Sequence, residues 1–235
     1  MSISTLKKSS IAPYLGIVPY EVALKLQQGL MQARAEDKIG DVLLLLQHPP
    51  VFTVGRFRGG EDIIVPQKTL AREGIAVFHT NRGGGITYHS PGQLVGYPIV
   101  NLKENGVGVR EYIWKLESAI IKLLLVLGIQ GHRLAGYPGV WASERKICSI
   151  GVHVSHHITT HGFALNVSND LRYFKYIRPC GLAGEVMTSV SELLGHRVEM
   201  KTVIGELRSS FLEIFGLSYE QESDRWLTGL DAQSG

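Results

Sequence analysis

A run of three glycines between two strand-like segments constrains the fold of this chain more than any other feature. The segment 82–97 reads RGGGITYHSPGQLVGY, follows the strand-like run 75–80 and leads into the apolar run 94–100. Because glycine has no Cβ, the backbone N–H groups of such a loop can approach a ligand closely. A plain hairpin turn would need only one or two glycines. The segment therefore predicts a binding loop carried on strands. Its polar groups come from Thr87, Tyr88, His89 and Gln93.

This loop matches neither of the common phosphate-binding patterns. The Walker A string, Gly-x-x-x-x-Gly-Lys-Ser/Thr, does not occur in the sequence. The dinucleotide pattern requires glycines that open a helix, whereas these glycines lead into Thr87, Tyr88 and Pro91, which favour an extended backbone. The loop alone therefore does not imply a nucleotide.

Composition places the chain among ordinary globular proteins. Hydrophobic residues make up 44% of its 235 residues, and the net charge of +3 is too small to indicate nucleic-acid binding. The first residues lack the apolar core of a signal peptide, and the apolar run 120–129 is interrupted by Lys122 and too short to span a membrane. Two cysteines do not make a disulfide framework. We therefore expect a cytoplasmic protein that binds neither nucleic acid nor membranes.

Helix and strand signals alternate along the chain. Expected helices cover 19–36, 66–73, 109–127 and 201–215, and expected strands cover 42–46, 51–54, 75–79, 140–141, 146–154 and 158–167. The first helix is expected to bury Val22, Leu26, Leu30 and Ala33 as one stripe. This order predicts a single α/β domain over 1–235, with a mixed sheet, flanking helices and a core at about 15–216. The polar tail after Gly216 is expected to be loose.

The two cysteines lie in different surroundings. Cys148 is part of a strand-like apolar run, so we expect it to behave as a small buried hydrophobic residue. Cys180 follows Pro179 and precedes Gly181, which suits a nucleophile on a bend, and Arg178 would favour the thiolate. A turn cysteine without a chemical task fits the same local sequence equally well. Both interpretations of Cys180 stay open on this evidence.

Four histidines fall close together, at His153, His156, His157 and His161. The sequence contains no His-Glu-x-x-His motif, and no nearby carboxylate completes a set of three ligands. We therefore expect these residues to flank a hairpin at 155–158, and we expect no metal site.

Taken together, these motifs resemble those of the lipoyl(octanoyl) transferase family. The family pattern Arg-Gly-Gly-x-x-Thr-aromatic-His-x-x-Gly-Gln-x-aliphatic-x-Tyr is matched at every fixed position of 82–97. Further matches occur at 139–141, 145–152, 161–166, 179–182 and 188–189. The resemblance extends from about residue 55 to about residue 194.

The resemblance implies mixed sheets flanked by helices, similar to the catalytic domains of biotin protein ligases and lipoate ligases. It implies that Cys180 accepts an acyl group, that Lys146 is its partner in a catalytic dyad, and that no cofactor is needed. The implied acyl donor is octanoyl-acyl carrier protein, and the implied acceptors are lipoyl domains of 2-oxoacid dehydrogenases and the glycine cleavage H protein. The residues implied to line the acyl site are Arg82, Gly83, Gly84, Gly85, Ile86, Thr87, Tyr88, His89, Ser149, Ile150, Gly151, Gly162, Phe163 and Ala164.

Three other functions remain open at this stage. An ATP-dependent lipoate or biotin ligase would share the glycine loop and the lysine-bearing strand, but an acyl-adenylate mechanism does not require Cys180. A thioesterase would use water in place of the acceptor lysine. A non-catalytic acyl-binding protein would leave Lys146 and Cys180 without a task.

Overall fold

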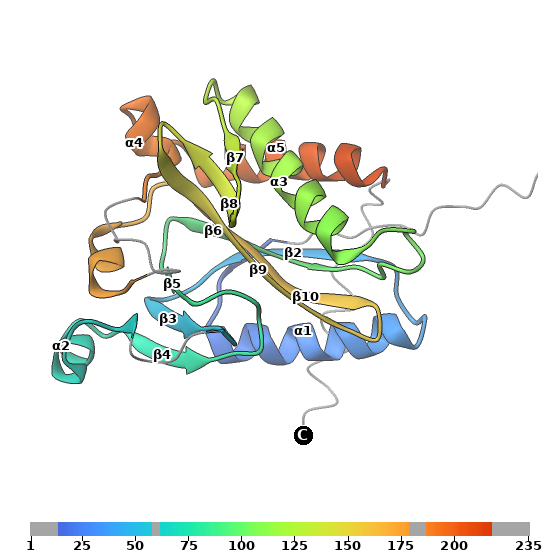
Figure 1. Cartoon of the computed structure of the whole chain (residues 1–235), viewed down its shortest axis with the longest axis horizontal. Helices are drawn as coiled ribbons and strands as arrows, with labels where there is room; N and C mark the ends of the chain where they lie inside the picture. Colours follow the sequence, from blue (N-terminus) through green and yellow to red (C-terminus); the bar gives the residue numbers. More distant parts are fainter. Residues whose placement is uncertain (1–13, 58–61, 179–186, 218–235) are drawn as a thin grey trace, which may run out of the picture.

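The computed structural model describes residues 14–57, 62–178 and 187–217. In this part of the chain, two sheets pack with helices on their faces (Figure 1). The larger sheet has seven strands in the order β1-β2-β6-β10-β9-β8-β7, and the smaller has three in the order β4-β3-β5. The strands are β1 Tyr14–Ile17, β2 Val42–Gln47, β3 Val51–Val54, β4 Ala76–His79, β5 Ile86–His89, β6 Gln93–Ile99, β7 His132–Leu134, β8 Tyr137–Ala142, β9 Arg145–Ser155 and β10 Ile158–Asn166.

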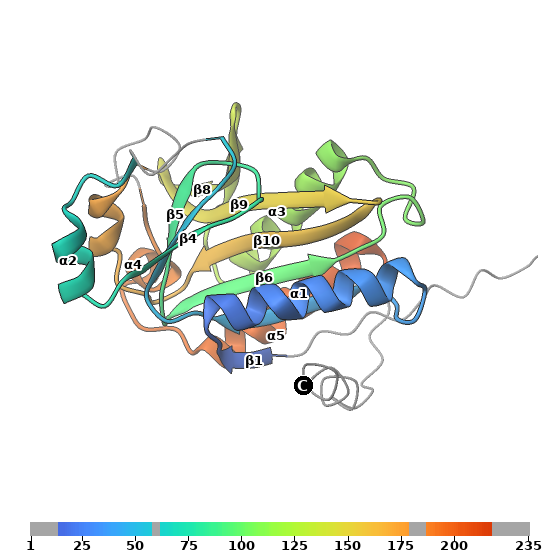
Figure 2. The same cartoon turned by 90° about the horizontal axis from the view of Figure 1, so that it is seen from below.

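The helices cover both faces of the larger sheet. They are α1 Tyr20–Ala35, α2 Gln67–Arg72, α3 Val109–Val126, α4 Val190–Leu194 and α5 Met200–Phe215, with a 3₁₀ helix, η2, at Arg172–Tyr176. Helix α1 lies along β6 and β10 on one face, while α3 and α5 pack together on the other (Figures 1 and 2). The expected mixture of sheets and flanking helices is confirmed. None of the helices described is both long and apolar enough to cross a bilayer.

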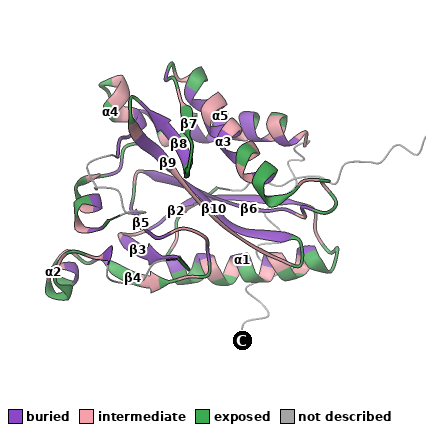
Figure 3. Ribbon diagram, viewed as in Figure 1, coloured by how far each residue is buried: buried purple, intermediate pink, exposed green. Residues whose placement is uncertain are grey.

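The central strands are buried on both faces, and the helices expose their outer surfaces (Figure 3). On the α3 and α5 side, the core includes Leu116, Leu123, Leu207 and Phe211. On the opposite side, Leu30 of α1 packs over the sheet. A third cluster lies under the small sheet. A strand sandwiched in this way explains why 42–46 is an uninterrupted apolar run.

The predicted stripe of α1 is confirmed at Leu30 and at Leu26, which packs against the same core cluster, but it is wrong at Val22 and Ala33. Val22 is 53% exposed and Ala33 is only partly buried, whereas Gln27 and Arg34 are buried. The Gln27 side-chain oxygen accepts a hydrogen bond from the His161 backbone N–H at 2.7 Å, and Arg34 pairs with buried Asp41 at 2.9 Å. Specific polar partners therefore rotate the helix away from the face that hydrophobicity alone selects.

The glycine loop does not join two neighbouring strands. It leads from β4 into β5, and β3 lies between these two strands in the small sheet. A turn separates β5 from β6, which contains most of the apolar run 94–100. The two strands belong to different sheets, β5 to the smaller and β6 to the larger. The loop therefore passes the end of β3, where Gly55 N–H donates to Gly85 O at 3.1 Å. It is thus a connection across the small sheet and no hairpin.

Candidate functional site

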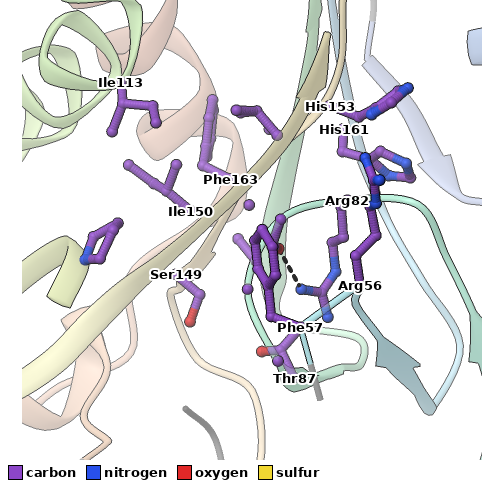
Figure 4. Close-up of a pocket in the computed structure, with 18 of the residues that line it drawn as sticks. Arg56, Phe57, Arg82, Thr87, Ile113, Ser149, Ile150, His153, His161 and Phe163 are labelled. Carbon is purple, nitrogen blue, oxygen red and sulfur yellow. Dashed lines mark hydrogen bonds between the residues drawn. The ribbon is translucent and has the colours of Figure 1, made fainter. Parts of the chain in front are cut away.

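A cavity of about 450 Å³ lies between the glycine loop and the larger sheet (Figure 4). Residues of β5 line one side, and residues of β6, β9 and β10 line the other. Most of the residues expected at an acyl site meet here. Those lining the cavity are Arg82, Gly83, Gly84, Gly85, Ile86, Thr87, His89, Lys146, Ser149, Ile150, Gly151, Gly162, Phe163 and Ala164.

Tyr88 is the one described member of the expected set that does not line the cavity. Its ring is buried and packs against Phe52, Tyr173 and Phe174, with centroid separations of 5.3, 5.4 and 5.6 Å. Successive side chains of a strand leave on opposite faces, and the Tyr88 side chain points into the core of the small sheet. Tyr88 therefore anchors β5.

The glycine loop is held from two sides. Gly83 N–H donates to Val152 O of β9 at 2.9 Å. A Cβ on Gly151 would lie 2.7 Å from Gly83 O, so this close approach requires glycine there. On the other side, the buried Arg82 guanidinium donates to the Thr53 carbonyl at 2.6 Å and to the Thr53 hydroxyl at 2.9 Å. Arg82 thus ties the loop to β3 while facing the cavity.

The two sides of the cavity differ in polarity (Figure 4). Ile113 and Ile150 lie on one side, and Arg56, His153 and His161 gather on the other. The apolar side suits a hydrocarbon chain. Burial, together with the nearby Arg82 charge, lowers the pKa of His161 to about 3. At neutral pH its imidazole is therefore uncharged.

A buried polar network lies behind the loop. His89 Nδ1 is 2.8 Å from Gln93 Oε1, and Gln93 donates from Nε2 to Asn166 Oδ1 at 2.9 Å. His89 Nε2 lies 3.2 Å from the Thr53 hydroxyl. Burial, reinforced by the neighbouring His48, holds the pKa of His89 well below its ordinary value. His89 is therefore a neutral hydrogen-bonding group that fixes β5 to β6.

Lys146 is buried in the cavity wall, with 6% of its surface exposed. It lies at the start of β9, with its Nζ 5.8 Å from the centroid of the Trp141 ring on β8. The pairing between these strands shifts here, because Trp141 faces Lys146 while Val140 faces Cys148. Ile147 is thus an extra residue, a β-bulge that redirects the start of the strand. Met187 pairs with Lys146 on the other side and also lines the cavity.

Cys180 lies outside the described residues. The chain before it is fixed at Arg178, whose N–H donates to Asp62 O at 2.9 Å. The first described residue after it, Met187, lies in the cavity wall. The other cysteine, Cys148, is buried as expected, and burial raises the pKa of its thiol to about 12. Cys148 is therefore a structural residue and is unsuited to act as a thiolate.

The histidine cluster is the expected hairpin. His156 and His157 form the turn between β9 and β10, with φ values of 50° and 65°. Within 14–57, 62–178 and 187–217, no three His, Cys, Asp or Glu side chains are grouped to hold a metal ion. The sequence analysis missed Asn81, whose Oδ1 lies 2.7 Å from His161 Nε2, and it gave no role to Asn166, although Asn166 falls in the matched segment 161–166. No motif or spacing pattern marks Asn81.

The family model for the lipoyl protein ligase A/B catalytic domain matches residues 19–212. The chain belongs to this family. An octanoyltransferase of Caldicellulosiruptor saccharolyticus is 44% identical over 208 residues, which is 88% of each chain. Among solved structures, a putative lipoate protein ligase of T. acidophilum with bound lipoic acid has a TM-score of 0.72 at 16% identity, covering 97% of this chain and 94% of that one. A biotin protein ligase of Aquifex aeolicus has a TM-score of 0.50 at 14% identity, covering 90% and 70%. These likenesses confirm the expected fold.

Proposed function

We propose that this family member is an octanoyltransferase that moves an octanoyl group from acyl carrier protein to a lysine of a lipoyl domain. The observation that carries the proposal is a lysine, Lys146, buried in the wall of a largely apolar cavity beside the glycine loop, in a chain that also has the Cys180 motif that a ligase does not require. The name of the octanoyltransferase relative, which aligns over most of both chains, supports the same activity.

The cavity suits the proposed acyl group in size and character. Its volume of about 450 Å³ falls within the usual range for small-molecule pockets. Ile113, Ile150 and Phe163 offer apolar surface to a hydrocarbon chain. Burying such a chain is favourable by roughly 0.8 kcal/mol for each CH₂ group. An acyl chain along this side would lead toward Lys146 and the glycine loop.

The proposed reaction proceeds through two acyl transfers. The Cys180 thiolate attacks the thioester carbonyl of the donor, and the thiol of the carrier leaves. The ε-amine of the acceptor lysine then attacks the new thioester, and the Cys180 thiolate leaves as an amide forms. An amide is more stable than a thioester, so this sequence consumes no ATP. The reaction requires Cys180 to be reduced and outside any disulfide, which matches a reducing cytoplasm.

In this scheme Lys146 exchanges protons with Cys180 and with the incoming amine. The amine of the acceptor must lose a proton as the amide forms, and a buried neutral amine can take it. Lys146 lies beside Trp141, Met187 and Gly139, and the Glu117 carboxylate accepts a hydrogen bond from Gly139 N–H at 3.0 Å.

An ATP-dependent ligase is the alternative, because lipoate ligases share this fold. The two activities are separated by supplying either octanoyl-acyl carrier protein without ATP or free octanoate with ATP, each with an apo lipoyl domain. The proposal predicts octanoylated lipoyl domain only in the first mixture. Product only in the second mixture would contradict it, and octanoyl-adenylate formation would identify a ligase.

A further inference from the structure

On the side of β9 that faces β10, the pairing partner changes between Cys148 and Lys146. Along most of its length β9 pairs with β10, and this register ends where Leu165 faces Cys148. Lys146 instead pairs with Met187 in a parallel bridge. Thr188 N–H donates to Lys146 O at 3.0 Å. The backbone at Met187 and Thr188 thus takes the place of β10 as the neighbour of Lys146.

Asn166 holds the segment of Met187 and Thr188 in place through a hydrogen bond. It is the last residue of β10 and is 3% exposed. Its Nδ2 donates to Thr188 O at 3.0 Å. The same residue, Thr188, therefore bonds to Lys146 through its N–H and to Asn166 through its carbonyl. Because Thr188 is fully buried, loss of the Asn166 donor would leave that carbonyl without a replacement from water.

The oxygen of the Asn166 amide has other partners, on β6 and in the segment after β10. Asn166 Oδ1 accepts from Gln93 Nε2 at 2.9 Å and from Asn169 Nδ2 at 3.1 Å. Gln93 also donates to Tyr88 O at 3.0 Å, and its own oxygen contacts His89. One side chain therefore joins the strand that follows the glycine loop to the backbone beside Lys146.

We propose that Asn166 is a positioning residue that sets the location of Lys146 through Thr188. This inference rests on the proposed acyl transfer, in which Lys146 exchanges protons with the reacting groups. Asn166 does not itself line the cavity. Asn166 would affect the reaction indirectly, because the rate of proton exchange falls when the exchanging group is displaced by about 1 Å.

The test uses Asn166→Asp in the full chain. Aspartate keeps oxygens that accept from Gln93 and Asn169 but replaces the amide that donates to Thr188. We expect kcat for octanoyl transfer to fall about tenfold or more, with KM for the octanoyl donor within about twofold of wild type. Asn166→Leu, which removes donor and acceptor alike, is the second variant if Asn166→Asp fails to fold, as judged by circular dichroism.

A double-mutant cycle with Lys146→Ala separates positioning from general loss of structure. If Asn166 acts through Lys146, adding Asn166→Asp to Lys146→Ala should lower kcat by less than about twofold further. The control Asn169→Ala removes a bond to the same Asn166 oxygen but keeps the bond to Thr188, and we expect kcat close to that of wild type.

Three results would overturn the inference: full kcat in a folded Asn166→Asp protein, multiplicative losses in the double mutant, or an equal loss in Asn169→Ala. Transfer by the wild type is measured first in the same assay. An inactive wild type would instead reject the proposed function itself.

Discussion

The two cysteine side chains have opposite roles. Cys148 packs in the main core, and burial raises its pKa to about 12. A thiol in that environment is neither a nucleophile nor a base at neutral pH. The chemistry proposed for Cys180 rests on its sequence motif. The two assignments are separable by mutation.

Cys180→Ala should abolish octanoyl transfer, whereas Cys148→Ala should leave it working. We expect Cys148→Ala to lower the free energy of unfolding by roughly 1 kcal/mol, because it removes a buried sulfur from a packed core. Transfer rates and urea melts of both variants test this. Loss of transfer in Cys148→Ala, with retention in Cys180→Ala, would reverse the assignment of the nucleophile.

Lys146→Arg should be nearly as damaging as Lys146→Ala. Arginine keeps the positive charge but does not give up its proton at accessible pH, so it would support a thiolate without serving as a base. The measurement is the transfer rate of the arginine variant against pH, with a thermal melt to verify folding. Turnover near that of wild type would show that Lys146 supplies charge only.

At the scale of elements, the glycine loop is held by the strands around it. Its backbone bonds to β9 through Gly83, and Arg82 bonds it to β3. Gly84 has φ of +84°, in the region that side chains with a Cβ rarely adopt. The loop conformation therefore depends on glycine at this position, and its contribution to catalysis can be tested there.

Gly84→Val should slow acylation of Cys180 while the protein stays folded. Valine resists positive φ, at a cost of about 1–3 kcal/mol, and the loop would shift from the place where it fixes the acyl carbonyl. Single-turnover mass spectrometry follows the acyl-enzyme.

The matched control is Gly106→Val, at φ +65° in a loop that does not line the cavity. A Cβ there meets no atom within 4 Å. We expect this control to lose stability through the same strain but to acylate at the wild-type rate. Full-rate acylation in folded Gly84→Val would mean that the loop is only a connection.

Sequence reasoning located four of the five α-helices described, missing the short α4, and most of the strands, because hydrophobic periodicity and glycines at element ends are local signals. It failed where contacts distant in the sequence decide the outcome. Gln27 and Arg34 are buried on α1 because their partners, His161 and Asp41, come from other elements. The bulge at Ile147 depends on how β9 pairs with β8. The sequence of β9 alone does not indicate this register.

The candidate site shows the same division. Motif residues such as Gly151 and Phe163 meet in one cavity, and local sequence marks them. Asn166 makes hydrogen bonds to Gln93 on β6 and to the Thr188 carbonyl. These two partners are far apart in the sequence and meet only in the folded protein. Tyr88 lies within the motif, yet its side chain turns into the small sheet because of the strand pairing.

At the scale of the whole molecule, buried neutral histidines make stability depend on pH. Burial lowers the pKa of His48 to about 4 and that of His161 to about 3, and it also lowers the pKa of His89. In the unfolded chain these groups titrate near pH 6.5. Below that pH the unfolded state binds more protons, so folded stability should decrease as the pH falls toward the folded pKa values.

Thermal melts between pH 7.5 and pH 5 should therefore show a falling Tm. Each such histidine contributes up to roughly 1.4 kcal/mol per pH unit. His48→Gln should flatten the slope, because glutamine takes up no proton in this range. The control is His156→Gln, at the exposed hairpin turn, which should keep the wild-type slope. A Tm that does not change over this range would contradict the burial of these groups as neutral imidazoles.

The proposed function depends most on one step, the formation of a covalent octanoyl thioester on Cys180. Intact-mass spectrometry after incubation with octanoyl-acyl carrier protein tests it most directly. We expect the enzyme to gain the mass of one octanoyl group, and peptide mapping to place that group on Cys180. Addition of apo lipoyl domain should remove the group from the enzyme, and the domain should gain the same mass. Transfer to the lipoyl domain with no acyl-enzyme in single-turnover runs, or acylation at another residue, would contradict it.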